Sequence, residues 1–386
     1  MTGRERMLCA IERKTPDVLP VTTHHVMPYY LQKYQGGISI REFFDKFGFD
    51  AVNWHVSQLP GAGERIDPAQ GEKGFLDSTR IISDYWQVKA EDVADPQYKT
   101  VRYTITTPGG ELTLSLQSNE YTTWIVEHPI KEKKDMELVA QYVPHPLCDV
   151  PGSQKALDEV GERGIVRTHI PTTIDLFGQP GCWQDACCMV GTERLIMETY
   201  DDPEWVHELL GIIRERKLAY IRSMKGAAYD IIELGGGDGS STVISPGIFE
   251  EFLLPYDKAL IEEAHNSGQR ISYHLCGGKM PLLDLIAEMG MDALETLTPS
   301  SMGGDADLAV VKRKLGGKMC LIGGFDQNTY FVGNTPEQTR QAVRRCFEQA
   351  GEGGGYIIAP SDHFFDAQDD LLHAFVDEAH ACAYGG

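Results

Sequence analysis

Short apolar segments that alternate with helical segments constrain the fold of this chain more than any other feature. Eight segments rich in β-branched residues end in small or polar residues, and we expect strands at 18–24, 50–55, 164–170, 230–234, 271–276, 292–297, 319–325 and 356–360. Helical segments separate the last six, and some begin with a capping residue followed by proline, as at Ser245-Pro246 and Thr335-Pro336. Repeated strand–helix units of this kind predict a parallel sheet.

Eight such units predict an α/β protein in which a single domain, residues 1–386, forms a closed (β/α)8 TIM barrel. An open doubly wound sheet is the alternative, but it usually has fewer strands and a glycine-rich first turn, which is missing here. The connection between the second and third strands is too long for a simple barrel crossover. Within it, residues 101–106 and 111–116 alternate polar and apolar side chains around a Pro-Gly-Gly turn. This pattern predicts an inserted β-meander at about 90–130.

The charge balance excludes several classes of partner. The chain has 57 acidic residues against 35 lysines and arginines, a formal net charge of −22. Such a surface repels nucleic acids and anionic membranes. The sequence has no apolar run of the ~18 residues that a membrane span needs, and its first residues do not follow a signal-peptide pattern. The nine scattered cysteines are typical of reduced thiols. We therefore expect a cytoplasmic protein that binds neither nucleic acid nor membrane.

Titratable residues follow the predicted strands at the points where the strands end. In a TIM barrel, functional groups lie at the carboxyl ends of the strands. The residues at these ends are His24, His25, His169, Glu233, Asp238, His274, Cys276, Glu295, Asp362 and His363. We expect them to converge on one face of the barrel.

The sharpest local pattern is the His-x-Cys pair at the end of the fifth strand. Residues two apart in a strand point to the same face, so His274 and Cys276 could bind one metal ion. Zinc suits nitrogen and sulfur ligands and needs about four of them. The predicted third ligand is Glu295, and the fourth is Asp362 or His363. The alternative is that His274 is a hydrogen-bonded core residue and Cys276 a buried thiol.

Aromatic residues near the strand ends could line an apolar substrate pocket, although ordinary packing is the alternative for each. These residues are Tyr29, Tyr30, Trp54 and Phe364. Glu233, at the end of the fourth strand, is also predicted to bind the substrate.

Several motifs together resemble the uroporphyrinogen decarboxylase superfamily. They are Arg4-Glu5-Arg6-Met7-Leu8, Ile170-Pro171-Thr172-Thr173-Ile174-Asp175, His274-Leu275-Cys276-Gly277-Gly278 and Gly354-Gly355-Tyr356-Ile357-Ile358-Ala359-Pro360. The resemblance covers nearly the whole chain except the insertion at about 56–150. It implies a barrel fold, pairing into a homodimer, and either decarboxylation or methyl transfer with corrinoid proteins.

The resemblance favours the methyltransferase branch. The decarboxylase would carry an arginine-rich segment after the first strand, whereas residues 22–28 contain no arginine. Zinc-binding methyltransferases of the superfamily use His-x-Cys and a late cysteine, but this chain has Ser361-Asp362-His363 at the late position. One thiolate fewer makes a zinc site more Lewis-acidic, which suits a methyl ether donor.

The resulting hypothesis is an O-demethylase-type methyltransferase. It would move a methyl group from a small methylated substrate, such as a phenyl methyl ether, to the Co(I) corrinoid of a partner protein, with zinc as Lewis acid. His24, His25, His169 or Asp238 could donate a proton to the leaving oxygen. The alternatives are methyl transfer from a methyl-corrinoid to a thiol or folate, a metal-free decarboxylase, and a corrinoid-binding scaffold protein.

Overall fold

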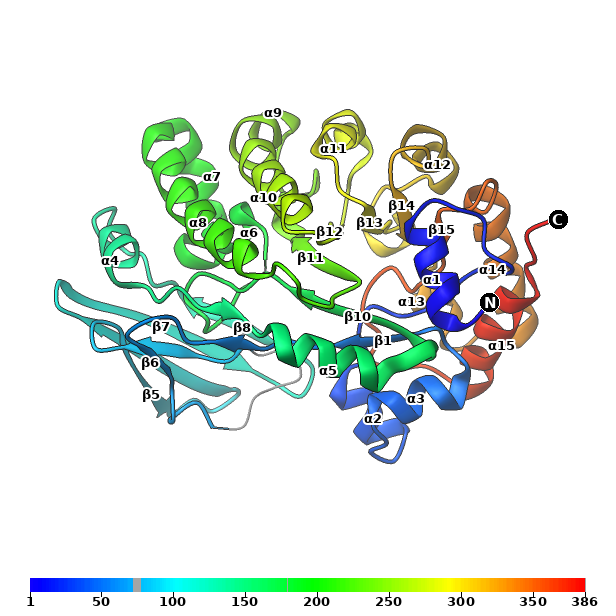
Figure 1. Cartoon of the computed structure of the whole chain (residues 1–386), viewed down its shortest axis with the longest axis horizontal. Coiled ribbons are helices and arrows are strands. Elements are labelled where there is room, and N and C mark those ends of the chain that lie inside the picture. Colours follow the sequence, from blue (N-terminus) through cyan, green and yellow to red (C-terminus); the bar gives the residue numbers. More distant parts are fainter. Residues whose placement is uncertain (72–77, 179, 386) are drawn as a thin grey trace.

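A curved parallel sheet forms the centre of the molecule (Figure 1). The computed structural model describes residues 1–71, 78–178 and 180–385. Seven strands pair in parallel and in the following order: β1 (Ala51–Trp54), β10 (Gly164–His169), β11 (Ile231–Gly235), β12 (Ile271–His274), β13 (Ala293–Thr296), β14 (Cys320–Gly323) and β15 (Tyr356–Ile357). The predicted α/β class with a parallel sheet is confirmed.

The first expected strand, 18–24, is not a regular strand. Val21 makes one parallel bridge to Ile358, and its carbonyl accepts a hydrogen bond of 2.8 Å from the amide of Asp50. The amide of Val21 donates to the Asp50 carboxylate at 3.0 Å. Because the Asp50 carboxylate takes the place of a backbone carbonyl as the acceptor for Val21, the segment forms an isolated bridge and no continuous run of strand hydrogen bonds. The described part of the chain therefore holds seven strands in this sheet rather than the expected eight.

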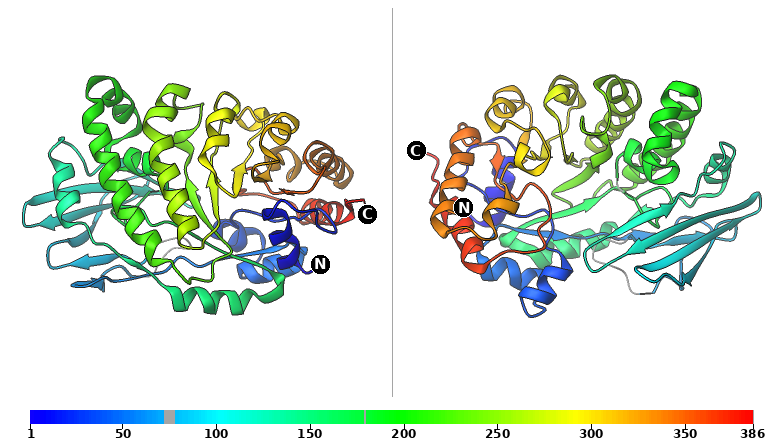
Figure 2. Two further views of the ribbon diagram at one scale, coloured as in Figure 1. Left: turned by 45° about the horizontal axis from the view of Figure 1, so that its top comes forward. Right: turned by 180° about the vertical axis from the view of Figure 1, so that it is seen from behind.

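Helices surround the sheet, and Figures 1 and 2 show those drawn in green to dark yellow in a row along one side of it. The surrounding helices are α5 (Val150–Val160), α6 (Cys182–Val190), α7 (Thr192–Asp201), α8 (Pro203–Ser223), α9 (Pro246–Ile248), α10 (Leu254–Asn266), α11 (Leu283–Met289), α12 (Leu308–Leu315), α13 (Gln327–Tyr330), α14 (Pro336–Ala350) and α15 (Asp369–Ala381). The predicted helix starts at Ser245 and Thr335 are confirmed, since both side chains accept a hydrogen bond from the first turn.

Shorter elements complete this layer. The N-terminal part contributes α1 (Gly3–Ile11), α2 (Pro28–Tyr34) and α3 (Ile40–Phe47), and α4 (Asp135–Tyr142) precedes α5. Single helical turns lie at Gly161–Arg163, Gly237–Gly239, Met280–Leu282 and Ser300–Met302, and a π-helical turn, Phe249–Leu253, joins α9 to α10. No helix in the described ranges is both long and apolar enough to cross a membrane.

An antiparallel sheet lies between β1 and β10 in the chain and projects from the end of the molecule away from both termini (Figure 1). Its strands, in order, are β5 (Gln87–Val93), β6 (Lys99–Thr107), β7 (Gly110–Ser118) and β8 (Thr123–Glu127). Alternation along β6 and β7 buries Ile105, Leu112 and Leu114 on one face. Two small pairs flank it: β2 (Gln58–Leu59) with β9 (Leu147–Cys148), and β3 (Glu64–Ile66) with β4 (Ile81–Ser83). A meander was expected at about 90–130, and its standing as a separate unit stays a prediction.

A buried ion pair anchors the loop that follows β10. The Nζ atom of Lys217 on α8 lies 2.9 Å from Asp185 on α6, and both side chains are fully buried. Lys217 also donates to the carbonyl of Pro171, and Asp185 accepts hydrogen bonds from the amide and hydroxyl of Thr173. These contacts hold residues 170–175 against the helices and so position the end of β10.

We predict that Lys217→Met destabilises the fold by about 3–5 kcal/mol, because Asp185 is left as a buried charge without compensation. The matched control is Lys314→Met, whose partner Asp284 is mostly exposed, and we expect a loss below about 1 kcal/mol. Urea unfolding of both variants measures the difference. Equal losses would show that the buried pair has no special structural role.

Candidate functional site

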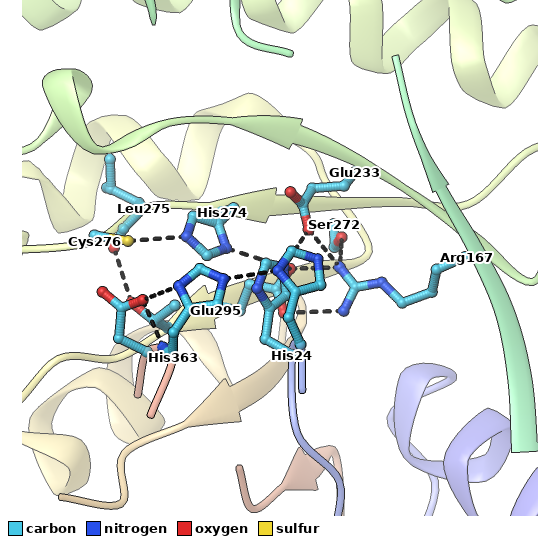
Figure 3. A network of polar contacts seen from close by, with 12 residues as sticks. His24, Arg167, Glu233, Ser272, His274, Leu275, Cys276, Glu295 and His363 are labelled. Atoms are coloured by element: carbon cyan, nitrogen blue, oxygen red, sulfur yellow. Dashed lines mark hydrogen bonds and ion pairs between the residues drawn. The ribbon is translucent and has the colours of Figure 1, made fainter. Parts of the chain in front are cut away.

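Arg167 is the centre of a polar cluster at the carboxyl end of the sheet (Figure 3). Its Nη2 atom lies 3.0 Å from Glu233 Oε2 and 2.5 Å from Glu295 Oε1, and its Nη1 atom donates to Glu295 Oε2 at 3.1 Å. It also donates to the hydroxyl of Ser272 at 2.9 Å. All of these side chains are buried. A charge can be buried only when it is paired, so one guanidinium and two carboxylates support one another here.

His24 is oriented by one of these carboxylates. Its Nε2 atom lies 2.7 Å from Glu233 Oε2 and 3.9 Å from Glu295 Oε1. Burial lowers the pKa of His24, and the two carboxylates only partly offset this. Burial raises the pKa of Glu233, but the charge and hydrogen bond of His24 and the charge of His274 together outweigh it, so the net pKa is lowered. Trp54 donates to the backbone carbonyl of His24 at 2.9 Å and stacks its ring on Arg167 at 4.7 Å.

The predicted His274–Cys276 pair is in direct contact. His274 Nε2 lies 2.8 Å from Cys276 Sγ, and His274 Nδ1 lies 3.8 Å from Glu295 Oε1. Burial lowers the pKa of His274, but the charge and hydrogen bond of Cys276, followed by Glu295, raise it well above its usual value. The imidazole therefore lies between a thiol and a carboxylate, with one ring nitrogen directed to each.

A second imidazole pair lies beside this one. His25 Nδ1 is 2.7 Å from His363 Nε2, and the two rings stack with centroids 5.0 Å apart. The other nitrogen of His363, Nδ1, lies 2.8 Å from Asp362 Oδ1. Burial raises the pKa of Asp362, but the hydrogen bond and charge of His363 and the charge of His274 together lower it well below its usual value. The group is therefore a carboxylate. Burial and the neighbouring His24 and His363 lower the pKa of His25 well below its usual value.

Two groups of side chains bring possible metal ligands within 4.8 Å of one another in the described part of the chain. One consists of His24, His25 and His363. The other consists of His24, Glu233, His274 and Glu295. Of the five predicted ligands, His363 belongs to the first group and His274 and Glu295 to the second, and the two groups share His24. Cys276 contacts His274, and Asp362 contacts His363. A single zinc site that uses four of them stays a prediction.

Other predicted site residues lie further from the cluster. Asp238 accepts hydrogen bonds from Gln184 at 2.8 Å and Thr192 at 3.1 Å, so its carboxylate is directed toward α6 and α7. His169 ends β10, and its Nδ1 atom lies 3.3 Å from the carbonyl of Ile170. The involvement of Asp238 and His169 in proton transfer stays a prediction.

The predicted substrate-binding aromatics have different surroundings. Tyr30 and Phe364 are buried and pack edge to face at 5.1 Å, which favours the packing alternative for both. Tyr29 is half-buried and packs at 4.6 Å on Tyr121, which comes from the turn between β7 and β8. Tyr121 also meets Phe365 at 5.4 Å. The antiparallel sheet therefore contacts the two segments that carry His25 and His363, and it forms an aromatic rim there.

Sequence reasoning missed Arg167 and Lys279. An arginine inside an apolar strand such as Gly164–His169 is a signal for a buried partner, because arginine is almost never fully buried unless it is paired. Lys279 follows the Gly277-Gly278 pair, and its buried Nζ atom donates to the carbonyl of Gly277 at 3.0 Å. Burial lowers its pKa to about 8, against the opposing charges of Cys276 and Asp305. Tyr121 carried no comparable signal.

A family model for uroporphyrinogen decarboxylase (URO-D) matches residues 100–382, which is more than half of the chain. The chain belongs to the URO-D family. Curated relatives of this URO-D family chain include the uroporphyrinogen decarboxylase of Thioalkalivibrio sulfidiphilus, 26% identical over 227 residues, which cover 56% of this chain and 62% of that protein. They also include the methylated-thiol–coenzyme M methyltransferase of Methanosarcina mazei, 27% identical over 161 residues, which cover 42% of this chain and 41% of that protein. The matches thus span less than two thirds of these relatives' own length.

Solved structures agree on the fold of the URO-D chain. A methyltransferase from Methanosarcina mazei superposes with a TM-score of 0.60 at 14% identity and covers 98% of both chains. A B12-independent methionine synthase from Shewanella superposes with a TM-score of 0.50 at 11% identity and covers 94% of this chain and 97% of that one. At these identities the likeness concerns the fold alone.

The buried Lys279 predicts a pH-dependent stability. Its pKa is about 8 in the folded chain, below its usual 10.5, so the unfolded chain binds more protons between these values and stability rises as the pH increases. Lys279→Met should remove this slope, which integrates to about 3 kcal/mol as an order of magnitude. Unfolding by urea between pH 7 and 10 measures it. The exposed Lys225→Met serves as control, and an unchanged slope in Lys279→Met would contradict the assignment.

Proposed function

We propose that this chain is a methyltransferase of the O-demethylase type, which moves a methyl group from a phenyl methyl ether or a similar small compound to the Co(I) corrinoid of a partner protein. Membership of the URO-D family and the methyltransferase among its relatives support the reaction class. The observation that carries the proposal is the contact of 2.8 Å between His274 and Cys276 beside Glu295.

The charges of the cluster favour methyl transfer over decarboxylation of a porphyrinogen. A substrate with many carboxylates needs cationic side chains that are free to bind it. Arg167, the arginine of the cluster described here, is already paired with Glu233 and Glu295. The cluster thus offers a neutral, methylated substrate a better environment than a polyanion.

The donors fit a zinc ion held by His274 and Cys276. Zinc binds imidazole nitrogen and thiolate sulfur, and a metal-bound histidine usually donates its other N–H to a carboxylate. Nε2 of His274 faces the sulfur, and Nδ1 faces Glu295, which Arg167 holds in place. In this arrangement Glu295, which the sequence predicts as the third ligand, would instead orient His274, and Asp362 or His363 would be the remaining predicted ligand. When bound, zinc would supply the Lewis acidity that polarises the ether oxygen and stabilises the leaving phenolate.

The remaining residues would bind the substrate and donate a proton to the leaving oxygen. Ring faces of Tyr29, Tyr121 and Phe365 at the rim suit a flat aromatic donor. Of the predicted proton donors, His24 and His25 lie within the cluster, and His169 ends β10 in register with Glu233, so these three fit the role best.

Transfer in the opposite direction, to a thiol acceptor, is less well supported. A zinc site that activates a thiol usually carries a second thiolate. Cys320 begins β14, at the end of the strand remote from the cluster, and is fully buried, so it is not placed to supply that thiolate.

The test is incubation with a panel of methoxyaromatic compounds and a reduced corrinoid protein, followed by absorbance of the methylated corrinoid. We expect transfer by the wild type and a loss of about 100-fold or more in Cys276→Ser and His274→Ala, with a parallel loss of zinc. Cys9→Ser on α1 is the matched thiol control and should keep full activity. No transfer by the wild type from any donor would refute the function. A fully active Cys276→Ser would refute the zinc site alone.

A further inference from the structure

Three imidazoles gather next to the His274–Cys276 pair, with the ring centroid of His24 4.5 Å from that of His274. His24 and His25 lie a few residues before α2, and His363 lies a few residues after β15, so the group joins distant parts of the chain. One ring nitrogen of each lies within 4.8 Å of the other two. The ring centroids are 3.8 Å apart for His24 and His25 and 5.7 Å apart for His24 and His363. His24 and His25 are buried, and His363 is partly exposed.

The neighbouring carboxylates determine which nitrogens carry protons. An ionised carboxylate can only accept a hydrogen bond. Glu233 therefore places the proton of a neutral His24 on Nε2, and Asp362 places that of His363 on Nδ1. The lone pairs are then at Nδ1 of His24 and Nε2 of His363. Each is the nitrogen of its ring that faces away from the carboxylate.

Hydrogen bonds within the protein use only one of these lone pairs. Nε2 of His363 lies 2.7 Å from His25 Nδ1 and can accept its proton. Nδ1 of His24 is buried and has no hydrogen-bond partner in the described ranges. A buried polar atom left in this way costs about 1–3 kcal/mol, so it calls for a ligand.

We propose that His24, His25 and His363 bind a divalent transition metal ion such as zinc, at a site distinct from the His274–Cys276 pair. Imidazole is a suitable ligand for these ions, and metal-bound histidines are held from behind by carboxylates, as Glu233 and Asp362 hold two of these rings. Zinc–nitrogen bonds of about 2.0–2.1 Å would require the contact between His25 and His363 to open by about half an ångström. A partly exposed His363 leaves a path for the ion.

A three-histidine set has a consequence for the chemistry of the cluster. Three protein ligands leave the fourth position of a tetrahedral ion open to water or to an oxygen of the substrate. The site stands on these side chains alone and does not depend on the donor or on the direction of methyl transfer. With the site occupied, His363 is a ligand that Asp362 orients, so neither residue completes the set of His274 and Cys276. His24 and His25 are then ligands rather than proton donors, which leaves His169 in that role.

Cobalt(II) titration of the full chain tests the proposal, because a thiolate ligand adds an intense near-ultraviolet band that imidazole ligands lack. Cys276→Ser should lose that band and still bind cobalt with a visible spectrum of the imidazole type. Adding His363→Gln or His25→Ala to Cys276→Ser should abolish the remaining spectrum. His265→Ala removes an exposed histidine that is paired with Asp292, and it should bind as the wild type does. Circular dichroism verifies that each variant is folded.

The same titration can contradict the proposal in three ways. Complete loss of binding in Cys276→Ser would show one shared site. Unchanged affinity in both His25→Ala and His363→Gln would show that these imidazoles bind no metal, as would a wild type that binds none. The shape-conserving Asp362→Asn adds a further readout, since it should weaken the histidine site by about 10- to 100-fold and leave the thiolate band unaffected.

Discussion

The guanidinium of Arg167 lies between the carboxylates of Glu233 and Glu295, and the arrangement of the imidazoles follows from that pairing. Two carboxylates buried without a cation would be too costly to keep ionised. Arg167 keeps both charged, and each then has lone pairs left for a ring nitrogen. Glu233 uses one on His24, and Glu295 faces His274. Arg167 on β10 therefore positions the two carboxylates that in turn orient His24 and His274.

The local pairing of charges around Arg167 explains how a chain with a large negative net charge can hold a compact cluster of imidazoles and carboxylates. The net charge of −22 is a sum over the whole chain, whereas the buried charges of the cluster balance one another locally. Glu233 determines which nitrogen of His24 carries the proton, and Asp362 does the same for His363. The other nitrogen of each ring then presents its lone pair to the cluster. The buried ion pair of Lys217 and Asp185 likewise anchors the loop that follows β10.

The sequence was sufficient for the parallel sheet and for the gathering of His24, His274, Glu295 and His363, because strand ends share one edge of a sheet. The sequence was insufficient where the direction of a side chain depends on a partner that is distant in the chain. Hydrogen bonds from Gln184 and Thr192, which no spacing reveals, turn Asp238 toward the helices. Tyr30 and Phe364 pack on one another in the core, which favours a packing role over substrate binding. The carboxylate of Asp50 binds the amide of Val21 and so interrupts the first expected strand. Arg167 went unnoticed because its two partners lie on other strands.

The central claim is that Glu233 and Glu295, held by Arg167, and Asp362, which orients His363, direct ring nitrogens to bind metal. Anomalous diffraction at the zinc absorption edge, from crystals grown with zinc, tests it most directly. The account predicts one peak between His274 Nε2 and Cys276 Sγ and another among His24, His25 and His363. A cluster without a peak, in crystals where zinc occupies a surface pair such as His265 and Asp292, would contradict it.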